Sequence, residues 1–511
     1  MMNKFKEKIT LNPVMTFLIL ILITIVLSGF LNLIGFEATY NKIDTVTGEY
    51  IVTSESVESL LSLRGIKYIF TSTVSNFTAF TPLSMLIIIL IGIGIMEKSG
   101  FLKTAFTILT KFCKKYTITF WIVLLSVLMS ITGDLGYVIM IPLSALLFSY
   151  GRRNPLLGIV SAYAGLTAGS GLNILFTSVD SEMLKYTLAN ANRIDPNYVL
   201  TTGAFILIMS VAVILVSLII TIITERFSIR NIEKYEYKEE KKELRLGKRE
   251  YRGLLFSISA GVLYLLIFIY NIIPGLPFSG NLLDYTQSFY IDKLFSHDSF
   301  FSNGFVFIVT MLFIILGLFY GIGAKTIKNN NDFCEDLTHS LDGTGRTLIL
   351  IFLGSILINV FKKTNIGTVL TISVTNLLEG MSLSGIPLII GLFVIVAFAT
   401  FFVTNAAAKW AIISTVAIPM FMNNSLSPEF AQTIARFAEC ATIGLTPLLA
   451  YFTIYIAYLE KYNQNEEPIS LFRTLKYQIP YSVCVGLFLL LLVIGWYLIG
   501  LPIGINGYIA T

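Results

Sequence analysis

Long apolar segments recur along the whole sequence, and they limit the possible folds more than any other feature. Many of them reach about 20 residues, the length an α-helix needs to cross about 30 Å of hydrocarbon. Only 13% of the 511 residues are charged and 55% are hydrophobic, whereas soluble proteins carry about a quarter charged residues. The sequence therefore predicts an all-α polytopic membrane protein with about nine transmembrane helices.

Two apolar stretches are too short for two full crossings, and polar residues interrupt each of them. Residues 118–150 are about 33 in number and contain Asp134, whereas residues 387–422 are about 36 in number and contain Asn405 and Lys409. Two crossings with a turn need more than about 40 residues. Polar groups at such depth must face protein or a water-filled cavity. Both stretches are therefore predicted to be re-entrant hairpins, entering from opposite sides of the membrane.

Each hairpin is followed by an apolar helix with a predicted break. Residues 155–180 contain small residues just before Asn173, and residues 428–458 contain Gly444 between two threonines. Glycine costs about 1 kcal/mol in a helix interior. Backbone groups freed at such breaks form binding sites in many transporters.

The order of hairpin, broken helix and clean helix occurs twice, which predicts an inverted repeat. The first half covers residues 1–224 and the second covers residues 253–511, joined by a charged linker at 225–252 that is expected to be cytoplasmic and solvated. A short echo between residues 71–77 and 371–377 supports the repeat.

The distribution of basic residues predicts the orientation of the chain in a cell inner (cytoplasmic) membrane. Lys4, Lys6 and Lys8 precede the first helix and favour a cytoplasmic amino terminus. The net charge of +5 comes from loops between apolar spans, so we expect the lipid bilayer rather than a nucleic acid as partner. Lys362 and Lys363 conflict with this topology, because they fall in a loop expected to face outside.

Several motifs spread over nearly the whole chain resemble one known family. They are Ser75–Leu83, Gly92–Gly100, Asp134–Tyr137, Ile141–Leu143, Asn154–Leu156, Asn173–Asp180, Thr364–Gly367, Ala408–Ala411 and Pro419–Met422. With these motifs, the sequence resembles the p-aminobenzoyl-glutamate transporter (AbgT) family within the ion transporter superfamily.

The resemblance implies a dimeric, bowl-shaped transporter with nine transmembrane helices and two hairpins. Members of the family import p-aminobenzoyl-glutamate or export sulfonamide antimetabolites with the help of an ion gradient. By resemblance, the functional aspartate of the family falls on Asp180 and its hairpin tryptophan on Trp410. A proline and an arginine of the family fall on Pro428 and Arg436.

This chain departs from the family pattern at the expected site. Ala407 replaces a small hydroxyl residue ahead of Ala-Lys-Trp. Where the family motif reads Arg-x-Gly-Asp-Ser-x-Thr-Asn, this chain has Glu439, Cys440 and Ile443 in place of the aspartate, serine and asparagine. The loss of the serine and the asparagine removes side-chain donors and acceptors.

The charged residues near the breaks allow several roles. Asp180 could relay a proton, bind a cation or lie at the outer interface, and Asp134 could bind a cation or a proton. Arg436 and Glu439 are neighbours on one helix face. They either neutralise each other or, with Arg436 binding a substrate carboxylate bidentately, form part of the binding site. Lys409 is expected to pair locally or to snorkel.

The remaining predicted substrate ligands lie near helix breaks, where half-helix amino termini favour anions. Asn173 and Asn405 are assigned by this argument, and Pro428 by the resemblance. Trp410 either stacks on an aromatic ring of the substrate or anchors its hairpin.

The function predicted from these features is ion-gradient-coupled secondary transport of a small amphipathic carboxylate such as p-aminobenzoyl-glutamate. The coupling ion is a proton or sodium, and we expect no cofactor, no metal and no catalytic residue. A proton-driven exporter of sulfonamide-like drugs or metabolites is the alternative, and a channel is a further one. An intramembrane enzyme is disfavoured, because the two histidines, His297 and His339, fall in predicted loops.

Overall fold

The computed structural model describes residues 11–237, 247–287, 290–296 and 298–509. The basic residues Lys4, Lys6 and Lys8, the linker residues 238–246 and His297 lie outside these ranges. Within them, nine helices are long and apolar enough to cross a membrane. They are Pro13–Leu33, Leu63–Lys98, Lys115–Thr132, Gly203–Asn231, Lys248–Ile272, Phe300–Ala324, Gly345–Lys363, Ala406–Asn423 and Leu471–Ile499. The predicted all-α polytopic membrane class is confirmed.

The chain begins with α1 (Pro13–Leu33), which starts at the N-cap residue Asn12. A β-hairpin that the sequence analysis did not predict follows: β1 (Glu37–Ile43) pairs antiparallel with β2 (Tyr50–Ser56), with Glu37 opposite Ser56 and Ile43 opposite Tyr50. The chain continues through α2 (Leu63–Thr78), α3 (Thr81–Lys98) and α4 (Phe101–Phe112).

Both predicted hairpins are present as pairs of short helices. The first consists of α5 (Lys115–Leu128) and α6 (Leu135–Tyr150), joined by a 3₁₀ turn and Gly133 with φ of 63°. The second consists of α17 (Gly385–Thr400) and α18 (Ala406–Asn423), joined by residues 401–405. The two helix pairs lie where the hairpins were predicted, and their re-entrant course in a membrane stays a prediction, because Lys115–Thr132 and Ala406–Asn423 are themselves among the nine helices long and apolar enough to cross.

Both predicted helix breaks are present as well. The first broken helix is α7 (Pro155–Gly169), which ends before a non-helical segment and is followed by α8 (Ser178–Asn192). The second is α19 (Pro428–Thr442), which passes through a 3₁₀ turn at Ile443–Leu445 to α20 (Phe452–Lys461). The span predicted to close at Asp180 instead continues, because that residue lies in the first turn of α8.

The remaining helices complete the two halves. They are α9 (Ile206–Ile223), α10 (Ile229–Asn231), α11 (Lys248–Ile272), α12 (Tyr290–Phe295), α13 (Phe300–Ala324), α14 (Asn330–Thr338), α15 (Gly345–Lys363), α16 (Ile366–Gly380) and α21 (Leu471–Ile499). The order of hairpin, broken helix and long helix occurs twice, over α5–α9 and over α17–α21.

The seven-residue echo does not mark equivalent positions in the two halves. Its two copies lie in short helices, α2 and α16. However, α2 leads into the long helix α3, whereas α16 leads directly into the hairpin helix α17. The support for a repeat therefore comes from the order of elements rather than from the echo.

The linker also differs from the prediction at its first residue. Glu225 is buried and forms an ion pair with Arg153, and it accepts a hydrogen bond from Thr119. A continuous helical path from α9 to α10 places this carboxylate against the first hairpin. Glu225 is therefore not solvated as expected, because two partners from other elements satisfy its charge.

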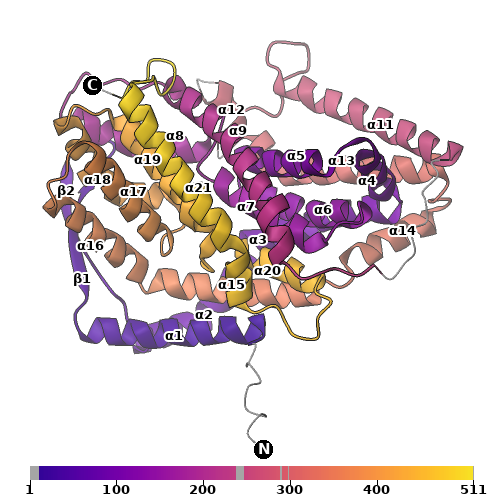
Figure 1. Ribbon diagram of the computed structural model, residues 1–511, viewed down its shortest axis with the longest axis horizontal. Coiled ribbons are helices and arrows are strands. Elements are labelled where there is room, and N and C mark those ends of the chain that lie inside the picture. The colour runs from indigo at the N-terminus through magenta and orange to yellow at the C-terminus, as the bar shows by residue number, and fades with distance from the viewer. Residues whose placement is uncertain (1–10, 238–246, 288–289, 297, 510–511) are drawn as a thin grey trace, which may run out of the picture.

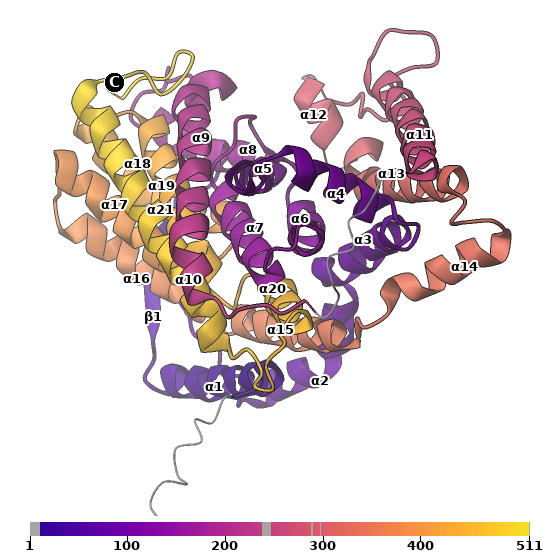
Figure 2. The same cartoon turned by 45° about the vertical axis from the view of Figure 1, so that its right-hand side comes forward.

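Two views show how these elements are arranged around the site (Figures 1 and 2). Helices α16–α19 and α21 form one side of the molecule, and α11, α13 and α14 form the other. The first hairpin, α7 and α20 lie between them, while α1 runs along one edge and contacts α15. Helices α7 and α19 are buried over almost their whole lengths, and each packs against both helices of the hairpin that precedes it.

Candidate functional site

A cavity of about 590 Å³ lies where the hairpin tips meet the helix breaks. Asp134 from the first hairpin tip and Asn405 from the second line it, as do Ser170 and Ile443 from the two breaks. Pockets that bind drug-sized ligands have volumes of about 300–1,000 Å³. The cavity is therefore large enough for one small organic molecule.

The two helix breaks pack directly against each other. A Cβ atom on Gly171 would lie 2.2 Å from the Arg436 carbonyl oxygen and 2.6 Å from the Cys440 Sγ. The Tyr163 hydroxyl donates a hydrogen bond to the Gly444 carbonyl oxygen at 3.4 Å. Only glycine at position 171 allows the unwound segment to approach α19 this closely.

This contact gives a direct test by substitution of Gly171 with alanine. We expect Gly171→Ala to destabilise the protein by about 1–3 kcal/mol, because the added methyl group would overlap backbone atoms of α19. The matched control is Gly495→Ala in α21, where no atom lies within 4 Å of the added Cβ. The control should be stabilising by about 0.5–1 kcal/mol. Thermal unfolding of the purified variants measures both, and equal melting temperatures would contradict the proposed packing.

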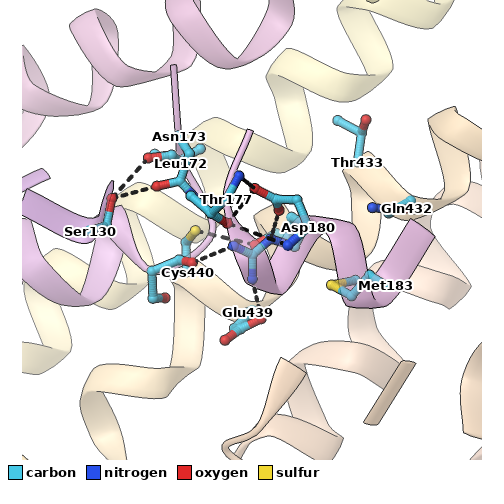
Figure 3. A network of polar contacts seen from close by, with 12 residues as sticks. Ser130, Leu172, Asn173, Thr177, Asp180, Met183, Gln432, Thr433, Glu439 and Cys440 are labelled. Carbon is cyan, nitrogen blue, oxygen red and sulfur yellow. Dashed lines mark hydrogen bonds and ion pairs between the residues drawn. The ribbon is translucent and has the colours of Figure 1, made fainter. Parts of the chain in front are cut away.

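Figure 3 shows a network of polar contacts that includes Asp180 and Glu439. The buried Arg436 guanidinium is its centre. Its Nε lies 3.0 Å from the Asp180 Oδ1, and its Nη1 donates to the Glu439 Oε2 at 3.2 Å. Its Nη2 donates to the Ser170 carbonyl oxygen at 2.6 Å. Arg436 thus joins α19 to α8 and to the end of α7.

The Asp180 carboxylate is fixed by the residue that caps α8. Its Oδ2 accepts hydrogen bonds from the Thr177 backbone amide at 3.1 Å and from the Thr177 hydroxyl at 2.6 Å. The Thr177 hydroxyl oxygen in turn accepts from the Asp180 backbone amide, which completes a capping box. Asp180 therefore uses one oxygen to start its helix and presents the other to Arg436.

Lys409 adds a second cation to the network. Its Nζ lies 3.8 Å from the Glu439 Oε2 and donates to the Thr400 hydroxyl at 2.6 Å. The residue is 2% exposed, so it pairs locally and does not snorkel. Two carboxylates, Asp180 and Glu439, thus face two cations, and the cluster is formally neutral.

Trp410 and Pro428 have structural partners outside the cavity. The Trp410 indole nitrogen donates to the Thr187 hydroxyl at 2.8 Å, and this hydroxyl donates to the Gln432 Oε1 at 2.6 Å. Pro428 is buried at the first position of α19, directly after its N-cap residue Ser427. Trp410 thereby anchors the second hairpin to α8 and α19. Its stacking on a substrate stays a prediction.

The two predicted asparagines lie at the ends of broken segments. The Asn405 side chain caps α18 by accepting from the Ala408 amide at 2.8 Å. One orientation of the Asn173 amide accepts from the Ser130 hydroxyl at 2.5 Å. In the other, its oxygen accepts from the Arg436 Nη2 at 3.2 Å. Asn173 therefore links the first hairpin tip to the Arg436 cluster.

The structure brings most of the predicted site residues together. Asp134, Asn405, Arg436 and Glu439 line the cavity, and Asp180 and Asn173 lie behind it as neighbours of Arg436. Trp410 and Pro428 are not among the residues that line it.

Several polar lining residues were not predicted as site residues, among them Glu182, Asn359, Lys362 and Tyr451. Two of them had a signal in the sequence: Asn359 lies inside an apolar helix, and Lys362 lies on the side expected to face outside.

Comparisons with known proteins identify the family of this chain. Residues 3–511 match the model of a family described as the AbgT putative transporter family. The p-aminobenzoyl-glutamate transport protein of Escherichia coli (strain K12) is 25% identical over 493 residues, which cover 96% of this chain and 93% of that protein.

Two solved structures are also similar. The Alcanivorax borkumensis YdaH transporter has 24% identity and a TM-score of 0.48, with 97% of this chain and 100% of that chain covered. Neisseria gonorrhoeae MtrF, described as illuminating a class of antimetabolite efflux pumps, has 27% identity and a TM-score of 0.49, with 98% of both chains covered. Since the family model spans almost every residue, this chain belongs to the AbgT putative transporter family.

Proposed function

We propose that this chain is an ion-gradient-coupled secondary transporter of a small amphipathic carboxylate, with p-aminobenzoyl-glutamate as the substrate to test first. The observation that carries the proposal is the cavity of about 590 Å³ beside the buried Asp180–Arg436–Glu439–Lys409 cluster. In this proposal the substrate crosses the membrane unchanged, and no cofactor takes part. The choice of substrate follows the relative from Escherichia coli.

The cluster offers a means of coupling an ion to the substrate. A carboxylate that is buried in one state and hydrated in another binds a proton with different affinity in the two states. Asp180 is 8% exposed and depends on one arginine for its charge compensation. A movement that separates α8 from α19 would expose this carboxylate. We therefore assign coupling first to Asp180 and second to Asp134, with a proton or sodium as the ion.

Reconstituted proteoliposomes test this function. We expect p-aminobenzoyl-glutamate to accumulate above its external concentration when a proton or sodium gradient is imposed, and accumulation to stop when an ionophore collapses that gradient. Empty liposomes are the control. Flux that never exceeds equilibration would contradict coupled transport and would favour a channel.

The direction of transport is a separate outcome of the same assay. An exporter of sulfonamide-like compounds or metabolites would move its substrate in the direction opposite to that of the coupling ion. An importer coupled by symport would move its substrate in the same direction as the ion. Vesicles with the ion gradient reversed distinguish the two directions. We further propose that the chain lies in the cell inner membrane as a homodimer with a cytoplasmic amino terminus, which cysteine accessibility and cross-linking can test.

A further inference from the structure

The two lysines that conflict with the predicted topology have different surroundings in the structure. The Lys363 Nζ lies 2.5 Å from the Glu58 Oε2, so its charge is compensated. Lys362 is exposed and lines the cavity. Among the residues that the structure describes, it forms no ion pair with a carboxylate. The two adjacent cations therefore cannot have the same role.

The other cations of the site are already neutralised. Arg436 lies against the carboxylates of Asp180 and Glu439, and Lys409 shares the Glu439 carboxylate. A buried cation held between two carboxylates gains little from a third anion, because its charge is already compensated. Lys362 is the cation in the cavity lining that has no such compensation in the described part of the chain.

We propose that Lys362 binds the carboxylate of the transported substrate, while Arg436 holds the network of the transporter itself. This inference rests on the proposed function and extends it, because it assigns the anion-binding position to α15. An ammonium group on a flexible stem can follow a carboxylate as the cavity changes shape. It also explains why a lysine lies in the last turn of α15, on a side of the membrane where the predicted topology does not favour one.

Asn359, one helical turn before Lys362, adds a second requirement for the substrate. Its Nδ2 donates to the Ser355 carbonyl oxygen at 2.8 Å, which leaves the Oδ1 as an acceptor in the cavity lining. Residues three apart on a helix are neighbours on one face. A ligand of this face needs a carboxylate for Lys362 and an N–H donor for Asn359. N-acylated amino acids carry both groups within a few bonds.

The competing explanation is that Lys362 is a solvated cation that favours the carboxyl end of α15 through the helix dipole. Lys363 ends the same helix and serves as the matched control, because Lys363→Gln removes the same charge one residue away. If Lys362 acts only through the helix dipole, Lys362→Gln and Lys363→Gln should change the affinity for carboxylates to a similar extent. If Lys362 binds the substrate, only Lys362→Gln should weaken binding.

Equilibrium binding to the purified full-length protein distinguishes these explanations. The probes are p-aminobenzoyl-glutamate, N-benzoyl and N-acetyl amino acids, and the uncharged diamide of p-aminobenzoyl-glutamate. We expect Lys362→Gln to weaken binding of the carboxylates about tenfold or more, the effect of losing one charged hydrogen bond. Binding of the diamide should change less than twofold, Lys362→Arg should retain most of the affinity, and Lys363→Gln should match the wild type.

Two outcomes overturn the assignment, and they can be told apart from failure of the proposed function. Equal affinity of Lys362→Gln and wild type for the carboxylates would show that Lys362 does not bind the anion, although transport would stand. Equal losses for the carboxylates and for the diamide would show a structural effect. If the wild type binds none of the carboxylates, the proposed function and the anion site both fall.

Discussion

We expect the substitution Asp180→Asn to abolish accumulation of substrate against its gradient in proteoliposomes. Asp180 presents one oxygen to Arg436 at 3.0 Å and the other to the backbone amide and hydroxyl of Thr177. Asparagine has one acceptor oxygen and one donor nitrogen. The asparagine therefore cannot accept hydrogen bonds from Thr177 and present an acceptor to Arg436 at the same time. Its amide also cannot bind and release a proton as a carboxylate does.

The substitution keeps Thr177 as the N-cap of α8, but it leaves Arg436 and Lys409 with Glu439 as their one carboxylate in the cluster. Removal of one partner from a buried ion pair costs about 3–5 kcal/mol, and the hydrogen bond from Arg436 to the Ser170 carbonyl oxygen remains. Size-exclusion chromatography and thermal unfolding must therefore show that the variant is folded before its transport is measured. Glu379→Gln is the control, because Glu379 is exposed on α16 and lies away from the cavity lining.

The assay must separate coupling from substrate binding. Exchange of labelled for unlabelled substrate across the membrane needs binding and movement but no ion gradient. We expect Asp180→Asn to retain measurable exchange while uphill uptake is lost. Accumulation at the wild-type level in this variant would refute the role of Asp180 in coupling. Loss of exchange together with uptake would instead assign Asp180 to binding or folding.

The all-α membrane class and the positions of the two helix pairs could be predicted from the sequence because length is a physical limit. A stretch such as residues 118–150 cannot contain two crossings and a turn, whatever its side chains are. The polar residues at each tip then locate the turn. A different argument, helix propensity, located the breaks near Asn173 and Gly444, because glycine weakens a helix. These predictions needed no information about tertiary contacts.

Two of the elements that were missed have sequences without an apolar signal. Helix α8 (Ser178–Asn192) is largely polar, and tertiary contacts stabilise it, such as the hydrogen bond between Thr187 and Gln432. The β-hairpin from Glu37 to Ser56 alternates weakly, although Gly48 with its positive φ marks the turn. A search for spans of about 20 apolar residues does not detect either kind of element.

The partners within the site depended on contacts far apart in the sequence. The spacing of Arg436 and Glu439 predicted their pairing, but it contained no information on Asp180 as the second partner of the arginine. Lys362 was noted only as a conflict in topology, because its place in the cavity lining depends on how α15 packs against other helices, such as α1 and α20. Charge compensation can be judged only when all the partners are known.

Replacement of Arg436 by glutamine should produce the largest loss of stability among the variants considered. The substitution leaves two buried carboxylates, Asp180 and Glu439, with Lys409 as their only cation in the cluster. Removal of one partner from a buried ion pair costs about 3–5 kcal/mol, because an uncompensated charge remains in a medium of low polarity. We therefore expect a strongly lowered melting temperature and little or no transport.

A second substitution tests whether charge compensation is the cause. In Arg436→Gln/Asp180→Asn, the Lys409–Glu439 pair at 3.8 Å remains, so each charge left in the cluster has a partner and part of the lost stability should return. Arg64→Gln is the control, because Arg64 is exposed on α2 and surface substitutions usually change stability by about 0.5 kcal/mol or less. If the double variant melts no higher than Arg436→Gln, packing of the arginine side chain against α7 and α8 stabilises the site more than its charge does.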